Sequence, residues 1–136
     1  MKQKFYYELN GEIDHKHFDF SNSFYNDKGD LLTSLPSEEM GIEFNKFTGD
    51  GVLIVIIPRL TLRGGEYNIG FSIKEGGRNV GGWDIIDEVK NAIKLNVIPG
   101  DYWKCNIINR PGDYLLLDGE ITNKSLNKNP GSLPIK

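Results

Sequence analysis

The sequence predicts an all-β domain, a sandwich of about eight antiparallel strands. Within residues 66–74, apolar side chains alternate strictly with small or polar ones, and residues 91–98 repeat the pattern. A period of two is typical of strands that bury one face. Turn residues rich in glycine separate many short segments of this kind, which favours a sandwich over other all-β arrangements.

The expected strands follow one another along the chain with short turns between them. They cover residues 3–9, 15–25, 31–34, 39–46, 52–57, 66–74, 91–98 and 114–121. The turn signals are Asn10-Gly11, Asp27-Lys28-Gly29, Ser34-Leu35-Pro36-Ser37, Thr48-Gly49-Asp50-Gly51 and Glu75-Gly76-Gly77-Arg78. The stretch from Trp83 to Ala92 fits either a short helix or the entry to a strand.

The run of expected strands predicts one domain over residues 1–121, followed by a loosely ordered polar tail over 122–136.

Composition excludes several classes of function. The chain has 136 residues and a formal charge of −3, and it contains no basic cluster, so nucleic acid is not expected as a partner. Its longest apolar run, Val52 to Ile57, is too short to insert into a membrane, and the N-terminus has no apolar signal core. The single cysteine, Cys105, excludes an internal disulfide, fits a reducing compartment and is expected to be buried or half-buried.

The polar side of the alternation predicts a binding face. If Phe18, Phe20 and Phe24 lie in the core, the residues between and before them point outward. The outward residues on three strands are mostly short and polar: His15, His17, Asp19, Ser21 and Ser23 on the first, Asn68, Gly70, Ser72 and Lys74 on the second, and Lys94 and Asn96 on the third. Short side chains leave a shallow trough with many donors and acceptors, which suits a sugar. An ordinary solvated sheet face is the alternative.

Aromatic residues near the loops add a second set of candidates. Trp83 and Trp103 can each stack on the face of a sugar ring, or can close one end of the core instead. Tyr102 precedes Trp103 directly, so one of the two is expected to be buried and the other exposed.

Catalytic sites are a weaker interpretation. His15 and His17 are two residues apart and, with Asp19, could bind a metal, but the chain has only two histidines. A glycosidase would need two facing carboxylates among Asp84, Asp87, Glu88, Asp101 and Asp113, and aspartates in turns are the simpler explanation. No catalytic residue, metal or cofactor is therefore expected.

Four segments together resemble a known family. They are Leu62-Arg63-Gly64-Gly65-Glu66-Tyr67-Asn68-Ile69 with Ile73, Asp87 to Tyr102 with its Asn91-Ala92, Leu95, Val97 and Gly100-Asp101-Tyr102, Phe24 to Leu32, and Asn109-Arg110-Pro111-Gly112. In this order and spacing they resemble the C-terminal domain of the ATPase subunit of O-antigen polysaccharide ABC exporters, over roughly residues 18–117. That domain usually has further strand before the position of Met1 and often ends on an aromatic strand where this chain has Leu117 to Ile121.

The resemblance implies an immunoglobulin-like or jelly-roll β-sandwich that recognises the end of an exported O-antigen glycan and performs no chemistry. The implied partners are the polysaccharide, a second copy in a homodimer, the parent ATPase and the membrane exporter subunit, at the cytoplasmic face of the inner membrane. The chain has no Gly-x-x-x-x-Gly-Lys-[Ser/Thr] motif, so this piece is not expected to hydrolyse ATP. The alternatives are a small jelly-roll enzyme, either a metal-dependent isomerase or a glycoside hydrolase, and a purely structural dimerisation sandwich.

Overall fold

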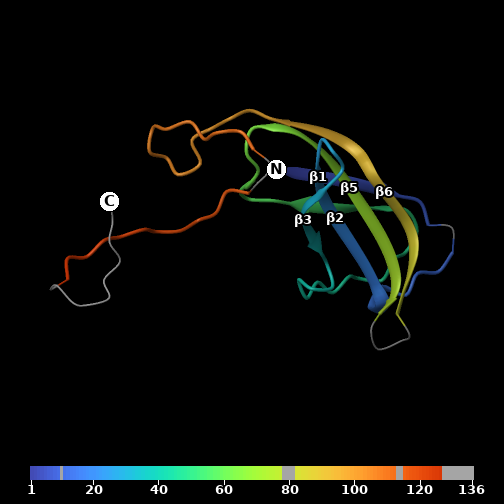
Figure 1. The fold of residues 1–136 in the computed structure, drawn as a ribbon. Helices are drawn as coiled ribbons and strands as arrows, with labels where there is room; N and C mark the ends of the chain where they lie inside the picture. Colours follow the sequence, from blue (N-terminus) through green and yellow to red (C-terminus); the bar gives the residue numbers. More distant parts are fainter. Residues whose placement is uncertain (10, 78–81, 113–114, 127–136) are drawn as a thin grey trace.

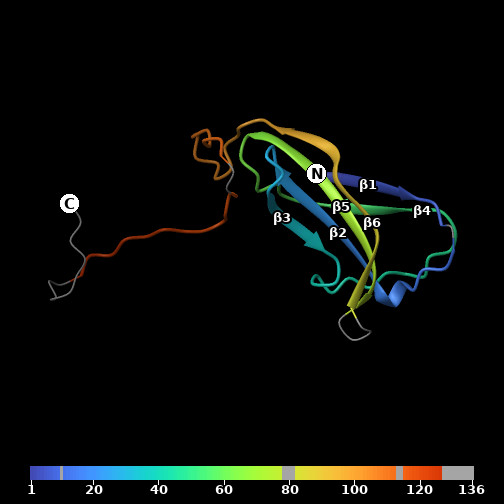
Figure 2. The ribbon, with the colours of Figure 1, turned by 45° about the vertical axis from the view of Figure 1, so that its right-hand side comes forward.

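The protein is an all-β sandwich of two antiparallel sheets, as the sequence predicts (Figures 1 and 2). The structure, a computed structural model, describes residues 1–9, 11–77, 82–112 and 115–126. One sheet pairs β1 (Lys2–Tyr7) with β4 (Gly51–Ile56). The other has the order β3-β2-β5-β6, formed by β3 (Leu31–Pro36), β2 (Phe18–Asn26), β5 (Gly65–Gly77) and β6 (Gly82–Val97). Within the described ranges, the only helix is the short 3-10 turn η1 (His15–His17).

The structure corrects two expected strands and decides the secondary structure of a third stretch, which the sequence left open. Residues 39–46 form no strand, because backbone hydrogen bonds from Met40 to Pro36 and from Ile42 to Ser37 close turns there. Residues 115–121 also form no strand, and positions 113–114 lie outside the described residues. The stretch 83–92, which fitted a helix or a strand, belongs to β6. The described part of the chain thus has six strands instead of about eight.

The core lies between the inner faces of the two sheets. Near one end, Phe24, Tyr67, Ile69 and Leu62 form a buried cluster. Farther along the same face, the ring centroid of Phe5 lies 5.1 Å from that of Phe20 and 5.5 Å from that of Phe71, so aromatic contacts join β1 to β2 and β5. Because these rings come from both sheets, their burial stabilises the sandwich as a whole.

A pair of buried amides also connects the two sheets. Gln3 on β1 donates from Nε2 to Oδ1 of Asn22 on β2 at 2.9 Å, and Nδ2 of Asn22 donates back to Oε1 of Gln3 at 3.2 Å. Asn22 Nδ2 also lies 3.3 Å from the carbonyl oxygen of Gly70 on β5. Asn22 is completely buried, and the pair satisfies polar groups that would otherwise face an apolar interior.

Replacing Asn22 with leucine is expected to lower the free energy of unfolding by about 1–3 kcal/mol, because the amide of Gln3 loses its partner inside the core. The double variant Gln3→Leu with Asn22→Leu should recover much of this loss, because no unpaired polar side chain then remains. Urea denaturation of the two single variants and the double variant measures the coupling. If the double variant loses the sum of the two single losses in unfolding free energy, the two amides are not coupled, which would contradict this prediction.

Strand β6 bends where its pairing with β5 is irregular. The register shifts between Ile69 and Phe71 and again between Ile73 and Lys74. At the first shift the backbone of β6 approaches Gly70 so closely that a Cβ there would lie 2.4 Å from the carbonyl oxygen of Val89. Glycine at position 70 therefore permits the bend, which curves β6 around the outer side of the sandwich (Figure 1).

Candidate functional site

The outer face of the four-stranded sheet carries the strongest candidate site, which we call the polar sheet face. It is defined by Ser21, Ser23, Tyr25, Ser34, Asn68, Ser72, Lys94 and Asn96. The strand pairing sets these residues in rows across the sheet. Ser21 lies opposite Ser72 and Ser23 lies opposite Ser34, whereas Asn68 lies between Tyr25 and Lys94.

The alternation of β2 and β5 explains why these side chains share a face. Phe20 and Phe24 on β2 and Ile69 on β5 are buried toward the other sheet. Their neighbours in sequence must therefore point the opposite way. The serines and Asn68 are half-buried, whereas Lys94 and Asn96 are exposed, so the face is accessible.

One end of the polar sheet face is hollowed. A shallow hollow of about 360 Å³ lies where the β2–β3 turn meets β5 and β6. Its lining consists of Asp27, Glu66, Tyr67, Asn68, Lys94, Leu95 and Asn96. The carboxylates accept hydrogen bonds, the ammonium of Lys94 donates them, and the two asparagine amides do both. Such a mixture can satisfy a ligand that carries several hydroxyl groups.

The structure brings together five of the ten residues that the sequence indicates. Ser21, Asn68, Ser72, Lys94 and Asn96 lie on the polar sheet face in the register described above. His15, His17 and Trp103 lie elsewhere, Asp19 contacts Ser21 but is buried, and the side chain of Trp83 lies outside the described part of the structure.

The placement of His15 and His17 on the sheet is wrong. Both lie in η1, before β2 begins at Phe18. Asp14 starts this turn by accepting a hydrogen bond from the N–H of Lys16 at 3.0 Å, and its Oδ2 lies 2.7 Å from Nδ1 of His17. The hydrogen bond with His17 is the main reason that the pKa of the Asp14 carboxyl is held below its usual value. The backbone of the η1 turn, and not the alternation of a strand, therefore sets the direction of the two histidine side chains.

Asp19 is also not available to a ligand. Its Oδ1 accepts hydrogen bonds from the hydroxyl of Ser37 at 2.8 Å and from the N–H of Glu38 at 2.9 Å, and its Oδ2 lies 3.3 Å from the hydroxyl of Ser21. With 5% of its surface exposed, Asp19 anchors the loop that follows β3. A carboxylate held by several donors serves the fold at this position.

Trp103 lies in the loop after β6. Its ring N–H donates to the carbonyl oxygen of Leu117 at 3.0 Å, and 46% of its surface is exposed. Tyr102, in contrast, is half-buried beneath the guanidinium of Arg59, which lies 3.6 Å from the ring centroid. The backbone of Trp83 pairs with Gly76, whereas its side chain lies outside the described part of the structure.

The loop that carries Trp103 is built around Asp101. The N–H groups of Cys105 and Asn106 donate to its carboxylate at 3.0 and 2.7 Å. These backbone hydrogen bonds, that from Cys105 first, hold the pKa of Asp101 below its usual value. Asp101 thus fixes a turn, as expected of an aspartate there. Cys105 is exposed, so the expectation that it is buried or half-buried is wrong.

Tyr25 and Ser34 are residues of this face that sequence reasoning missed, and Tyr25 is the larger of the two. The outward series of β2 continues from Ser21 and Ser23 to Tyr25, which lies opposite Asn68. Extending the period of two by one more step would have found it. Its phenol ring is half-buried beside the polar row and supplies the flat surface that the sequence had assigned only to tryptophans.

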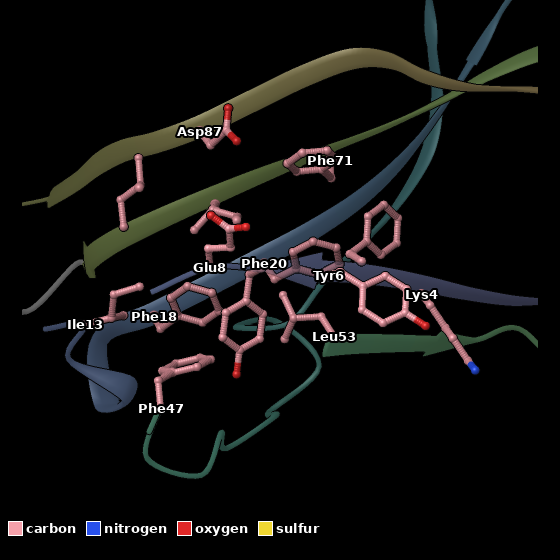
Figure 3. A pocket seen from close by; sticks show the side chains of 14 residues that line it. Lys4, Tyr6, Glu8, Ile13, Phe18, Phe20, Phe47, Leu53, Phe71 and Asp87 are labelled. Atoms are coloured by element: carbon pink, nitrogen blue, oxygen red, sulfur yellow. The ribbon is translucent and has the colours of Figure 1, made fainter. Parts of the chain in front are cut away.

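A second hollow, of about 490 Å³, opens between the two sheets (Figure 3). Phe18, Phe20, Phe47 and Leu53 point toward the same space from β2, β4 and the preceding loop. The rings of Phe18 and Phe47 already contact each other, with 4.7 Å between their centroids. The lining is mainly apolar, so this space is a partly open region of the core and offers few groups to a hydroxylated ligand.

Two further observations concern metals and membranes. Among the described residues, no group of three or more histidine, cysteine, aspartate or glutamate side chains is arranged to hold a metal ion. No helix in the described ranges has the length and apolarity needed to cross a membrane.

Comparison with known proteins does not assign a family. Searches with this sequence against protein-family models and against curated proteins return no match.

Proposed function

We propose that this domain is a non-catalytic carbohydrate-binding module that holds the end of an O-antigen polysaccharide on the polar sheet face. The observation that carries the proposal is the row formed by Tyr25, Asn68 and Lys94, which continues into the polar hollow beside it. A flat ring next to a donor and an amide is the combination that a sugar requires, because a pyranose has both an apolar face and a rim of hydroxyls.

The hydrogen-bonding capacity of the hollow supports this proposal. Asp27 and Glu66 can accept from adjacent hydroxyls, while Lys94 donates to a hydroxyl or ring oxygen. The serines of the neighbouring rows extend the polar surface along the sheet without filling it. A hollow that is shallow and open fits a chain end that must be released again better than it fits a buried cofactor.

The resemblance in sequence supplies the biological setting of the proposal. In the exporters that this chain resembles, such a domain would belong to an ATPase subunit that works with a membrane exporter subunit. The proposed module would then act in the cytoplasm at the inner face of the membrane, where it would select finished O-antigen chains for export.

Binding to an array of bacterial O-antigen polysaccharides, followed by titration of the best ligand, tests the proposal. We expect saturable binding to at least one polysaccharide, and we expect that masking the terminal sugar of that ligand abolishes binding. The ligand should be recovered unchanged after prolonged incubation with the protein. A shortened ligand would favour a glycoside hydrolase, and an array without any bound glycan would favour a purely structural sandwich.

A further inference from the structure

The hollow of about 490 Å³ between the two sheets, which we call the inter-sheet hollow, lies where the small sheet fails to cover the large one. In the described part of the chain the small sheet consists of β1 and β4, and the ring contacts of Phe5 place β1 over β2 and β5. The inner face of β6 is therefore left open, and Ile86 and Ile93 are 49% and 43% exposed there. A volume of this size lies within the range of about 300–1,000 Å³ that is typical of small-molecule sites.

The walls of the inter-sheet hollow are largely aromatic. Phe5, Tyr7, Phe47 and Phe71 line it and are only half-buried, although they stand between the two sheets. The ring area that the protein leaves uncovered is available to an apolar ligand. Because the face of an aromatic ring carries a partial negative charge, such rings also attract a cation that has lost part of its water. The walls therefore suit an apolar molecule that carries a positive charge.

Two carboxylates stand at the mouth of the inter-sheet hollow. Asp87 pairs with Ile73 across β5 and β6, and residues directly opposite each other share a face, so this aspartate lies on the inner side of the sheet. Glu8 follows β1 directly and lines the same hollow from the small sheet. Figure 3 shows the side chain of Lys4 running away from the rings, whereas Glu8 and Asp87 lie at the other end of the hollow.

The charge of these two carboxylates is not balanced by a cation of the described chain. The ion pairs within the described ranges join His17 to Asp14 and Arg59 to Asp118, and none includes Glu8 or Asp87. Lys4 is the only lysine or arginine among the described lining residues. A cleft that has apolar walls and one sign of charge at its mouth concentrates ligands of the opposite charge.

We propose that the inter-sheet hollow binds an organic cation of the alkylammonium class. The hydrocarbon body of the ligand lies among the aromatic rings, and its ammonium group lies at the mouth beside Glu8 and Asp87. A quaternary ammonium group fits best, because aromatic rings can replace the water around its methyl groups without leaving an N–H donor unpaired. The inter-sheet hollow and the polar sheet face lie on opposite faces of the four-stranded sheet, so this inference is independent of the proposed glycan binding.

Isothermal titration with soluble probes tests the selection for charge and for an apolar body. Octyltrimethylammonium is expected to bind saturably, whereas octyl sulfate, with the same chain and the opposite charge, should bind at least roughly tenfold more weakly. Tetramethylammonium has the charge without the chain and should also bind far more weakly. All three are used below the concentrations at which micelles form, and circular dichroism checks that the sheets stay intact. The proposal is overturned if octyltrimethylammonium does not bind, or if either of the other probes binds equally well.

Neutral variants test the two carboxylates. Asp87→Asn combined with Glu8→Gln keeps the shape of both side chains and removes their charges, so the affinity for octyltrimethylammonium should fall roughly tenfold. Glu88→Gln is the matched control, because Glu88 lies opposite Ser72 and thus on the other face of β6. It should bind like the wild type. An unchanged affinity of the double variant, or an equal loss in the control, would refute the role of the carboxylates and with it the proposal.

A pair of tryptophan variants locates the ligand. Ile86 lines the inter-sheet hollow and is half exposed, so Ile86→Trp should fill the mouth and abolish binding of octyltrimethylammonium. Ile85→Trp places the same ring one residue away, at a position opposite Lys74 that is 60% exposed and does not line the hollow, and it should bind like the wild type. Thermal melting shows that both variants are folded. If the two bind alike, the ligand lies outside the inter-sheet hollow and the proposal fails.

Discussion

Replacing Gly70 with valine is expected to lower the free energy of unfolding by about 3 kcal/mol. The Cβ of any other residue would lie 2.4 Å from the carbonyl oxygen of Val89 and 2.9 Å from the Cα of Lys90, and both are backbone atoms of β6. A flexible side chain could move aside, but β6 can only give way by losing its bend and part of its pairing with β5. The loss is measured by urea denaturation followed by circular dichroism.

Gly100 provides the matched control for this substitution. A Cβ at that position would meet nothing within 4 Å, so Gly100→Val should change the free energy of unfolding by less than about 0.5 kcal/mol. If both valine variants unfold at the same urea concentration, the close approach of β6 does not prevent larger residues from occupying position 70.

Replacing Asn68 with leucine is expected to reduce affinity for the cognate polysaccharide by roughly ten- to a hundredfold. Asn68 lies at the centre of the row between Tyr25 and Lys94 and lines the polar hollow. Leucine fills the hollow and leaves sugar hydroxyls without partners, which costs about 1–3 kcal/mol for each group. Because Asn68 faces outward and is only half-buried, the melting temperature should stay close to that of the wild type.

His17→Leu is the control for the binding experiment, because it introduces the same side chain outside the polar sheet face. It should bind like the wild type. Isothermal titration with one polysaccharide, alongside thermal melting, compares the three proteins. Equal affinity of all three proteins would show that Asn68 does not contribute to binding. A loss of affinity shared by both variants would point to an effect that is not specific to the polar sheet face.

The sequence correctly predicted the strands in which apolar and polar residues alternate along the chain. The period of two places Ile69 and Phe71 inward and Asn68 and Ser72 outward, and the structure has this arrangement. The same rule failed at His15 and His17, because Asp14 accepts the N–H of Lys16 and starts a 3-10 turn that interrupts the period. A short polar residue before the strand was the only signal of that turn.

Long-range contacts account for most of the remaining differences. Asp19 has the same local pattern as Ser21, but the loop after β3 buries it, and only the fold reveals that Ser37 is its partner. The length of β6 depends on irregular pairing with β5, for which Gly70 alone gave a hint. The described part of the expected strand over 114–121 makes single contacts with the segment after β4, such as the hydrogen bond from Leu116 to Thr61, and forms no strand.

The most direct test of the central claim is to follow backbone amide resonances by NMR while an oligosaccharide with the terminal structure of the bound polysaccharide is added. Binding on the polar sheet face predicts that the largest chemical-shift changes fall on β2, β5 and β6 around Tyr25, Asn68 and Lys94. Changes confined to the loop of Trp103, or to the aromatic residues between the two sheets, would contradict it.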